Sequence, residues 1–139
     1  MTEQVQLSAT IKATPAEVWQ ALTDAQIIKS YFFGAQVDST WEPGGPITWS
    51  GEYKGKKFQD KGTILAVEPN RKLEMTHWSP LSGLEDKQEN YHVVTWDISP
   101  RGGAAEVTLT QRNLTGMTPE AARKNWEPVL DGLKKVLES

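Results

Sequence analysis

Near the C-terminus, apolar residues recur at helical spacing. From Thr118 to Ser139 they return every three or four residues, with most charged residues between them, which is typical of an amphipathic helix. Thr118, Pro119 and Glu120 suit a helix N-terminus, as cap, first residue and dipole-matched acid. The stripe consists of Ala122, Trp126, Val129, Leu130, Leu133, Val136 and Leu137. We therefore predict a long C-terminal helix that lies on a large apolar surface.

Pro128 interrupts this helical pattern. A proline inside a helix cannot donate a hydrogen bond from its backbone nitrogen, and its ring clashes with the preceding turn. Two outcomes are open at this point. The helix either kinks near Asn125–Trp126 or breaks into two pieces, with Asn125 as the second N-cap.

The first third of the chain predicts one strand and two short helices. Apolar and polar residues alternate from Val5 to Ile11, as in a half-buried strand. The run Thr14–Glu17 has the spacing of a capping box, with proline at the first helical position. Asp24 can cap a second short helix, which ends at 32–34, where two phenylalanines precede a glycine.

From residue 36 to about 112, short alternating segments are separated by turn residues. We place hairpin turns at 55–56, 69–70, about 84–85 and 101–102, which gives a meander of about six strands. The order of strand, two helices, meander and long helix predicts an α+β fold. In such a fold an antiparallel sheet is covered on one face by helix.

Pairing outward from these turns places residues in rows across one face of the sheet, because the side-chain period of a strand is two. The apolar rows are Ile47, Ile64, Met75, Val94 and Leu109, then Ala66, Leu73, Trp96 and Val107. The polar row is Trp49, Gly62, His77, His92 and Gln111, with Asp60 and Asn90 beyond it. Gly62 opposite Trp49 should leave room. A face that changes from apolar to polar and roomy predicts a cavity.

Composition narrows the class of protein. The 139 residues fit one domain, 1–139. With 15 basic and 18 acidic residues, the net charge of −3 argues against nucleic acid as a partner. Without cysteine, disulfides, thiolate metal sites and a cysteine nucleophile are excluded. The sequence shows neither a signal-peptide pattern nor an apolar run of the ~18 residues that a membrane span needs, so we expect a cytoplasmic protein.

Four stretches carry a resemblance to a known family. They are residues 11–23, Gly44-Gly45 leading to Trp49, Gly62–Pro69 followed by 71–73, and Trp126–Leu137. With them, the chain resembles the helix-grip (START/birch-pollen-allergen, SRPBCC) superfamily, and within it the Hsp-90 ATPase-activator-homologue family. The resemblance covers nearly the whole length.

The resemblance implies a curved antiparallel sheet of six to seven strands that grips the last helix around an internal cavity. The family takes its name from a eukaryotic co-chaperone. That role depends on a partner and on an additional domain, which these residues do not supply. We therefore do not carry the co-chaperone role over.

His77 and His92 are the candidate chemical groups, because imidazoles titrate near neutral pH. They could handle a proton, orient a ligand, or simply be hydrogen-bonded polar residues at a sheet end. With Asp60 as a third ligand they would make a weak zinc site, since no cysteine or firmly placed carboxylate accompanies them. We therefore predict no metal and no cofactor, and we assign no catalytic residue.

Three functions stay open. We favour binding of an apolar or amphipathic small molecule between the sheet and the C-terminal helix. The alternatives are an enzyme with a histidine acid/base acting on a cavity-bound substrate, and a co-chaperone-type interaction module, for which the sequence gives no support. A homodimer is left open. The expected ligand contacts are Trp49, Met75, His77, His92, Trp96, Gln111 and Trp126.

Overall fold

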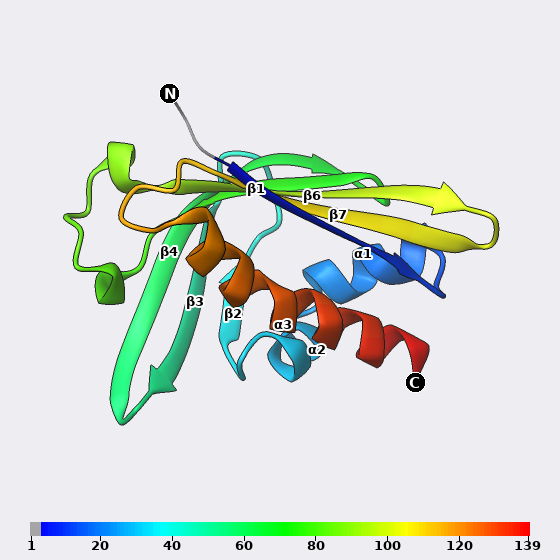
Figure 1. Ribbon diagram of the computed structural model, residues 1–139, viewed down its shortest axis with the longest axis horizontal. Coiled ribbons are helices and arrows are strands. Elements are labelled where there is room, and N and C mark those ends of the chain that lie inside the picture. The colour runs from blue at the N-terminus through cyan, green and yellow to red at the C-terminus, as the bar shows by residue number, and fades with distance from the viewer. Residues whose placement is uncertain (1–3) are drawn as a thin grey trace.

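The computed structural model describes residues 4–139, and it confirms the predicted α+β fold. Within this range, seven strands form one antiparallel sheet in the order β1-β7-β6-β5-β4-β3-β2 (Figure 1). The strands are β1 (Gln4–Ile11), β2 (Gln36–Ser39), β3 (Pro46–Tyr53), β4 (Lys56–Glu68), β5 (Lys72–His77), β6 (His92–Arg101) and β7 (Ala104–Arg112). The helices are α1 (Pro15–Thr23), α2 (Ala25–Tyr31) and α3 (Pro119–Glu138), with short 3-10 turns η1 (Pro80–Ser82) and η2 (Gln88–Asn90).

The helix starts form as predicted. Thr14 and Glu17 make a reciprocal capping box, with the Glu17 amide donating to Thr14 Oγ1 at 3.1 Å and the Thr14 amide donating to Glu17 Oε1 at 3.0 Å. Asp24 Oδ1 accepts from the first amides of α2. Thr118 Oγ1 accepts from the Ala121 amide at the start of α3. These local bonds satisfy amides that have no partner inside the helices.

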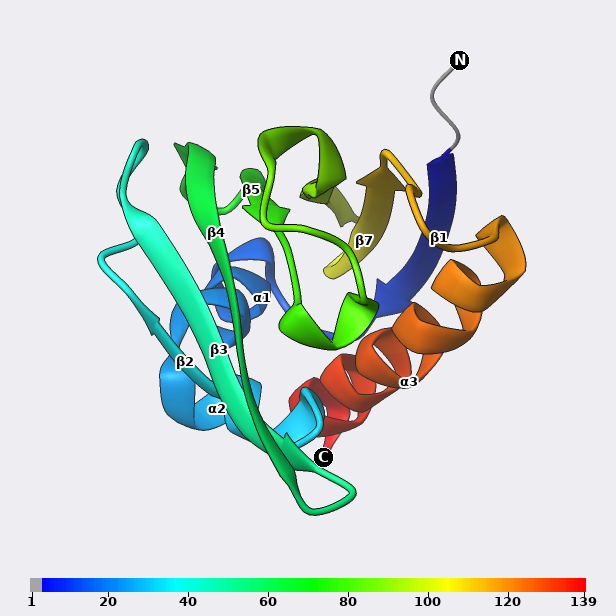
Figure 2. The ribbon, with the colours of Figure 1, turned by 90° about the vertical axis from the view of Figure 1, so that its left-hand side faces the viewer.

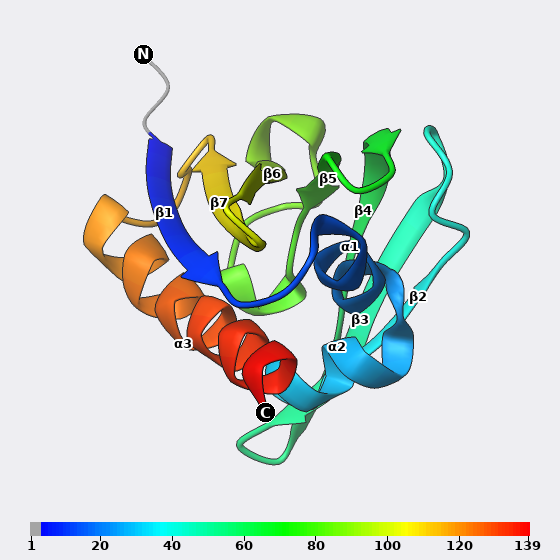
Figure 3. The same cartoon turned by 90° about the vertical axis from the view of Figure 1, so that its right-hand side faces the viewer.

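The sheet curves around α3, which lies on its concave side (Figure 2). Both ends of α3 are fastened to the free edge of β1 (Figure 3). Arg123 Nη2 donates to the Gln6 carbonyl at 3.1 Å, and the Lys12 amide donates to Glu138 Oε2 at 2.9 Å. The long helix thus also covers an edge strand that would otherwise offer unpaired backbone groups.

α3 is one helix of 20 residues that contains Pro128. The alternative of two helices with a second cap at Asn125 is therefore wrong, while the kink stays a prediction. Pro128 lies on the exposed side of the helix, whereas Val129 and Leu133 are buried. The apolar stripe on the sheet side holds the two halves together, although one backbone hydrogen bond is lost. Within residues 4–139, no helix is both long and apolar enough to cross a membrane.

Around β5 the register confirms the prediction. The pairs predicted and observed are Ile64–Met75, Met75–Val94, Leu73–Trp96 and His77–His92. A bulge between Ile64 and Ala66 changes the pairing beyond it, so Leu73 lies opposite Val67 and the predicted Ala66–Leu73 pair is wrong. The two histidines are therefore cross-strand neighbours, as expected.

In the two flanking hairpins the predicted register is wrong by two residues. Trp49 pairs with Asp60, not with Gly62, because the first turn is centred at 54–55 instead of 55–56. The other hairpin turns at 102–103 instead of 101–102. Moving a turn by one residue moves each partner by two, which keeps every side chain on its predicted face. In the first hairpin Ile47 lies opposite Gly62, whereas the prediction placed it opposite Ile64. In the second, Gln111 lies opposite Val94 and Leu109 lies opposite Trp96. The predicted pairs Val94–Leu109, His92–Gln111 and Trp96–Val107 are therefore wrong.

Gly62 has a different role from the one expected. A Cβ added at this position would overlap with the backbone carbonyl of Thr76 on β5. Glycine is needed because the two strands approach closely beside the bulge. The expectation that Gly62 leaves room opposite Trp49 is therefore wrong.

Candidate functional site

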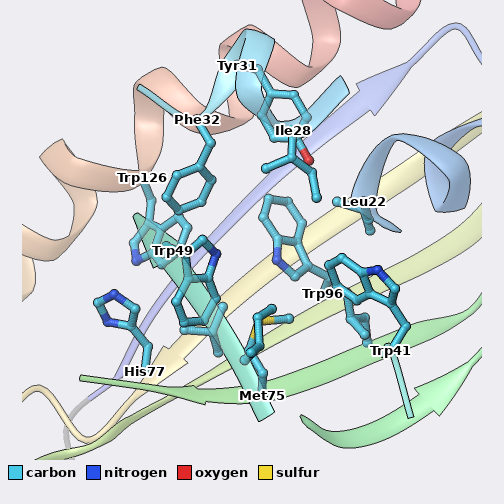
Figure 4. Close-up of a pocket in the computed structure, with 13 residues that line it drawn as sticks. Leu22, Ile28, Tyr31, Phe32, Trp41, Trp49, Met75, His77, Trp96 and Trp126 are labelled. Atoms are coloured by element: carbon cyan, nitrogen blue, oxygen red, sulfur yellow. The ribbon is translucent and has the colours of Figure 1, made fainter. Parts of the chain in front are cut away.

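Two hollows lie on the concave side of the sheet. The first, which we call the inner cavity, has a volume of about 30 Å³, enough for about one water molecule. His77, Trp126 and Phe32 lie at one end of it, and Trp41 and Leu22 at the other (Figure 4). The space deep under the helices is thus largely filled by side chains of the protein itself.

The inner cavity offers little free polar chemistry. Tyr31 contributes a hydroxyl to this region, but that group donates to the Ala21 carbonyl at 2.8 Å. Burial raises the pKa of Tyr31 far above its ordinary value, so the phenol stays protonated. Three of the expected ligand contacts, Trp49, Met75 and Trp96, line this cavity and are buried.

The second hollow, the outer pocket, has a volume of about 340 Å³ and opens at the polar end of the sheet. The loop between β5 and β6, which runs between β4 and α3 in Figure 2, supplies part of its wall. Four of the expected ligand contacts, His77, His92, Gln111 and Trp126, line it. His77 and Trp126, together with Phe32, line both hollows and form the wall between them.

His77 is anchored by Asp60. The distance from His77 Nε2 to Asp60 Oδ2 is 2.9 Å, and both side chains are largely shielded from water. The imidazole also meets Trp49 edge-to-face, with ring centres 5.0 Å apart. The second carboxylate oxygen, Asp60 Oδ1, is buried and has no hydrogen-bond partner among the described residues. An unpaired buried oxygen of this kind is costly and calls for an explanation.

His92 is held in one orientation by the connection between β7 and α3. Its Nδ1 faces the carbonyl oxygen of Asn113, so Nδ1 carries the proton. The Asn113 side-chain amide in turn donates to the carbonyls of Glu89 and Tyr91, both at 2.9 Å. Burial lowers the pKa of His92, which is 8% exposed. The neutral ring therefore presents Nε2 as a hydrogen-bond acceptor.

The two imidazoles stack across the strands, with ring centres 6.2 Å apart and an angle of 18° between the planes. Asp60 is hydrogen-bonded to Nε2 of His77, and the Asn113 carbonyl is hydrogen-bonded to Nδ1 of His92. Among residues 4–139, no hydrogen-bond partner is found for His77 Nδ1 or His92 Nε2. In the same range, no group of three or more His, Asp or Glu side chains is arranged to hold a metal ion.

Gln111 is occupied by other parts of the protein. Its Oε1 accepts from Trp126 Nε1, and its Nε2 faces the sulfur of Met117 at 3.3 Å. The side chain is 3% exposed. Gln111 therefore fixes the position of the Trp126 indole, and Trp126 presents its ring to the outer pocket.

Several residues of the outer pocket were missed by the sequence analysis. The sequence pattern predicts Phe32 and Phe33 only as the end of a helix, yet both line the pocket, and Phe33 is 70% exposed with a φ of 52°. Phe58 lies over Gly51, where an added Cβ would be 2.9 Å from the ring. Two aromatic residues directly before a glycine were the signal that could have indicated an exposed rim.

Trp78 also lines the outer pocket. Its indole stacks with Tyr91 at 6.3 Å, and Lys61 Nζ lies 5.6 Å from the ring centre. Lys61 also pairs with Asp86, which accepts from the Tyr91 hydroxyl. These hydrogen bonds raise the pKa of Lys61 and lower the pKa of Asp86, and they fasten the loop that walls the pocket.

Comparison with known proteins places these features in a wider group. The family model described as activator of Hsp90 ATPase homolog 1-like protein matches residues 12–138. The solution structure of ChR145 from Cytophaga hutchinsonii is 42% identical, with a TM-score of 0.82 over 98% of this chain and 94% of that chain. No curated protein matches the chain.

Two further solved structures share the fold at lower identity. CV1439 from Chromobacterium violaceum is 17% identical, with a TM-score of 0.82 over 99% of both chains. The Aha1 dimer from Colwellia psychrerythraea is 20% identical, with a TM-score of 0.74 over 98% of this chain and 96% of that chain. At these identities the likeness establishes the fold alone.

Proposed function

We propose, from the premise that this chain belongs to the activator of Hsp90 ATPase homolog 1-like family, that it binds an apolar or amphipathic small molecule. A sheet curved around α3 is consistent with a ligand held between them. We assign the ligand to the outer pocket, with the wall formed by Phe32, His77 and Trp126 at its inner end. The inner cavity would receive at most a small extension of the ligand.

The observation that carries this proposal is the composition of the outer pocket. Apolar and aromatic side chains surround it, while a few polar groups converge on it from different elements. Its volume of about 340 Å³ lies at the small end of the ~300–1,000 Å³ that is common for ligand pockets. A compact molecule therefore fits better than a long lipid chain.

Binding can be tested with a neutral apolar dye, N-phenyl-1-naphthylamine, together with native mass spectrometry of the purified protein. Asn125 lines the pocket from the exposed side of α3, so Asn125→Trp should fill the mouth without disturbing the core. We expect this change to weaken dye binding about tenfold or more and to remove any co-purifying molecule. Lys124→Trp, one residue away and outside the pocket, is the matched control. Failure of the unmodified protein to bind dye or a co-purifying molecule would contradict the proposal.

An enzyme is the second candidate, and the Asp60–His77 contact of 2.9 Å is what favours it. A carboxylate that orients an imidazole is a recurrent feature of general acid–base catalysis. His92, with its Nε2 free in the neutral form, could accept a proton from a bound substrate. A bell-shaped pH–rate profile that is lost in His92→Ala would support this candidate, whereas bound ligand without turnover would favour simple binding.

A protein-interaction role has less support. Among the side chains whose burial the structure describes, the large apolar ones that are exposed are Phe33 and Leu65, at 70% and 44%. Phe33 belongs to the rim of the outer pocket and Leu65 lies on β4, so they do not build a separate docking patch. A homodimer like the one described for the Colwellia protein stays open for this chain, and a cytoplasmic location stays a prediction.

A further inference from the structure

The charge of the outer pocket is biased toward the negative. Asp60 lines it, and the described lining residues include no lysine or arginine. Asp60 Oδ2 faces His77 Nε2 at 2.9 Å, while Oδ1 is buried without a partner. Burial lowers the pKa of His92, which favours the neutral form of that ring.

Several polar atoms that the wall offers are acceptors. His92 donates from Nδ1 to the Asn113 carbonyl, which leaves Nε2 as an acceptor. Asn90 donates from Nδ2 to the Glu85 carbonyl at 2.9 Å, which leaves its amide oxygen as an acceptor. Trp78 Nε1, which is buried and has no partner among the described residues, is a neutral donor and adds no positive charge. A ligand that brings donors or a positive charge would complement this set.

Aromatic rings supply most of the remaining surface. Phe33 meets Phe32 edge-to-face at 6.0 Å, and Phe32 meets Trp126 edge-to-face at 5.9 Å. Phe58 and Trp78 complete the aromatic lining. The faces of aromatic rings attract cations, and aromatic cages are a common means of binding ammonium groups. Rings, one carboxylate and no lysine or arginine among the described lining residues together match an organic cation far better than a carboxylate ligand.

We propose that the outer pocket selects an organic cation, an ammonium group with alkyl or aryl substituents, over neutral and anionic molecules of similar shape. This inference rests on the proposed binding of a small molecule and adds the sign of the ligand's charge. The ammonium group would lie against the aromatic rings on the Asp60 side of the pocket. Its apolar substituent would face Met117 and Val129.

Three small probes separate charge from shape. Benzyltrimethylammonium is the cation, neopentylbenzene is its uncharged carbon isostere, and 3-phenylpropionate is the anion. Binding can be followed by calorimetry and by the fluorescence of the tryptophans that line the pocket. We expect the cation to bind roughly tenfold or more tightly than its neutral isostere, and the anion to bind most weakly because Asp60 repels it.

The outcomes are distinguishable. If the neutral or anionic probe binds as tightly as the cation, the inference about charge is overturned while small-molecule binding stands. If none of the three probes nor the neutral dye binds, the proposed function itself is contradicted. This comparison uses the unmodified protein, so it does not depend on any variant folding.

Two variants locate the source of the selectivity. Asp60→Asn should reduce the preference for the cation over the neutral isostere, with the remainder due to the aromatic rings, whereas Asp97→Asn, at an exposed position on β6, should leave the ratio unchanged. Phe33→Leu should weaken cation binding roughly two- to fivefold through loss of a ring. A folded Asp60→Asn protein that keeps the full preference for the cation would overturn the assignment to Asp60.

Discussion

The inner cavity and the outer pocket lie on the same face of one sheet, but they differ in how completely they are filled. Around Trp96 and Leu73, apolar side chains leave about 30 Å³. Around His77, His92 and Asp60, about 340 Å³ stays open. Apolar side chains can interdigitate to the density of a crystal, whereas the positions of buried polar side chains are also set by their hydrogen-bond partners.

This contrast indicates different roles for the two ends of the sheet face, stability at the inner end and function at the outer end. At the inner end, the lining side chains are mostly apolar, as in a stable core, although Trp41 there has a positive φ of 57°. At the outer end, more features depart from the rules for a core: a buried carboxylate oxygen and a buried indole nitrogen that have no partner among the described residues, and an exposed phenylalanine with a positive φ. Departures of this kind tend to gather at functional sites, because stability elsewhere can offset their cost.

The sharpest test of this division compares two aromatic residues. Trp96→Ala, at the inner end, should lower the free energy of unfolding by about 3–5 kcal/mol through lost burial and a new cavity. Phe58→Ala, at the outer end, should cost about 1 kcal/mol because Phe58 is only half-buried. Urea unfolding of both variants measures the difference. Equal costs would show that the outer end is as much a structural core as the inner end.

A second test concerns the close approach of β4 and β5 at Gly62. Gly62→Ala should cost about 3 kcal/mol, because the new methyl group meets the Thr76 carbonyl, a backbone atom that cannot turn aside. Gly51→Ala is the matched control, since its methyl group meets only the end of the Phe58 ring. Thermal unfolding should show a much lower midpoint for the first variant than for the second. Similar midpoints would mean that β4 and β5 can move apart at little cost in free energy.

Much of the fold was predictable because its signals lie in neighbouring residues. The caps at Thr14, Asp24 and Thr118, and the stripe of α3, depend on residues within a turn of one another. Outside the bulge at Ile64–Ala66, strand faces were also predictable, since alternation survives a shift of two residues. Two turns were misplaced by one residue, because their positions depend on backbone geometry at Lys54, Gly102 and Gly103, all with positive φ.

The candidate site was only partly predictable. His77 and His92 were placed together by strand parity, which is a property of the sequence. The division of the hollow into two spaces depends on side-chain volumes from distant segments, such as Phe32 and Trp126. The loop that forms part of the pocket wall has no regular hydrophobic period. Its attachment to β4 through the ion pair with Lys61 therefore could not be predicted from a sequence pattern.

The polar end should also be the more sensitive to acid. Burial lowers the pKa of His92, so the unfolded chain binds more protons than the folded protein just below the ordinary histidine pKa of about 6.5. The stability that His92 contributes is therefore present above that pH and is lost as the pH falls. His92→Gln should reduce the fall in unfolding free energy between pH 7 and pH 5, measured by urea titrations at each pH. An unchanged slope would show that His92 is not a source of this dependence.

The smallest expected effect on stability falls at the rim, where Phe33 holds a left-handed backbone conformation with a φ of 52°. Phe33→Gly should relieve that strain and raise the unfolding free energy by about 0.5 kcal/mol, since the greater freedom of glycine in the unfolded chain offsets part of the gain. The same change removes a ring from the outer pocket, so binding of N-phenyl-1-naphthylamine should weaken while stability rises. Asn70→Gly, at a φ of 67° in the turn between β4 and β5, is the matched control and should leave dye binding unchanged. If Phe33→Gly gains stability without losing affinity, the exposed ring serves neither the fold nor the pocket, and the division between the two ends of the sheet does not extend to its rim.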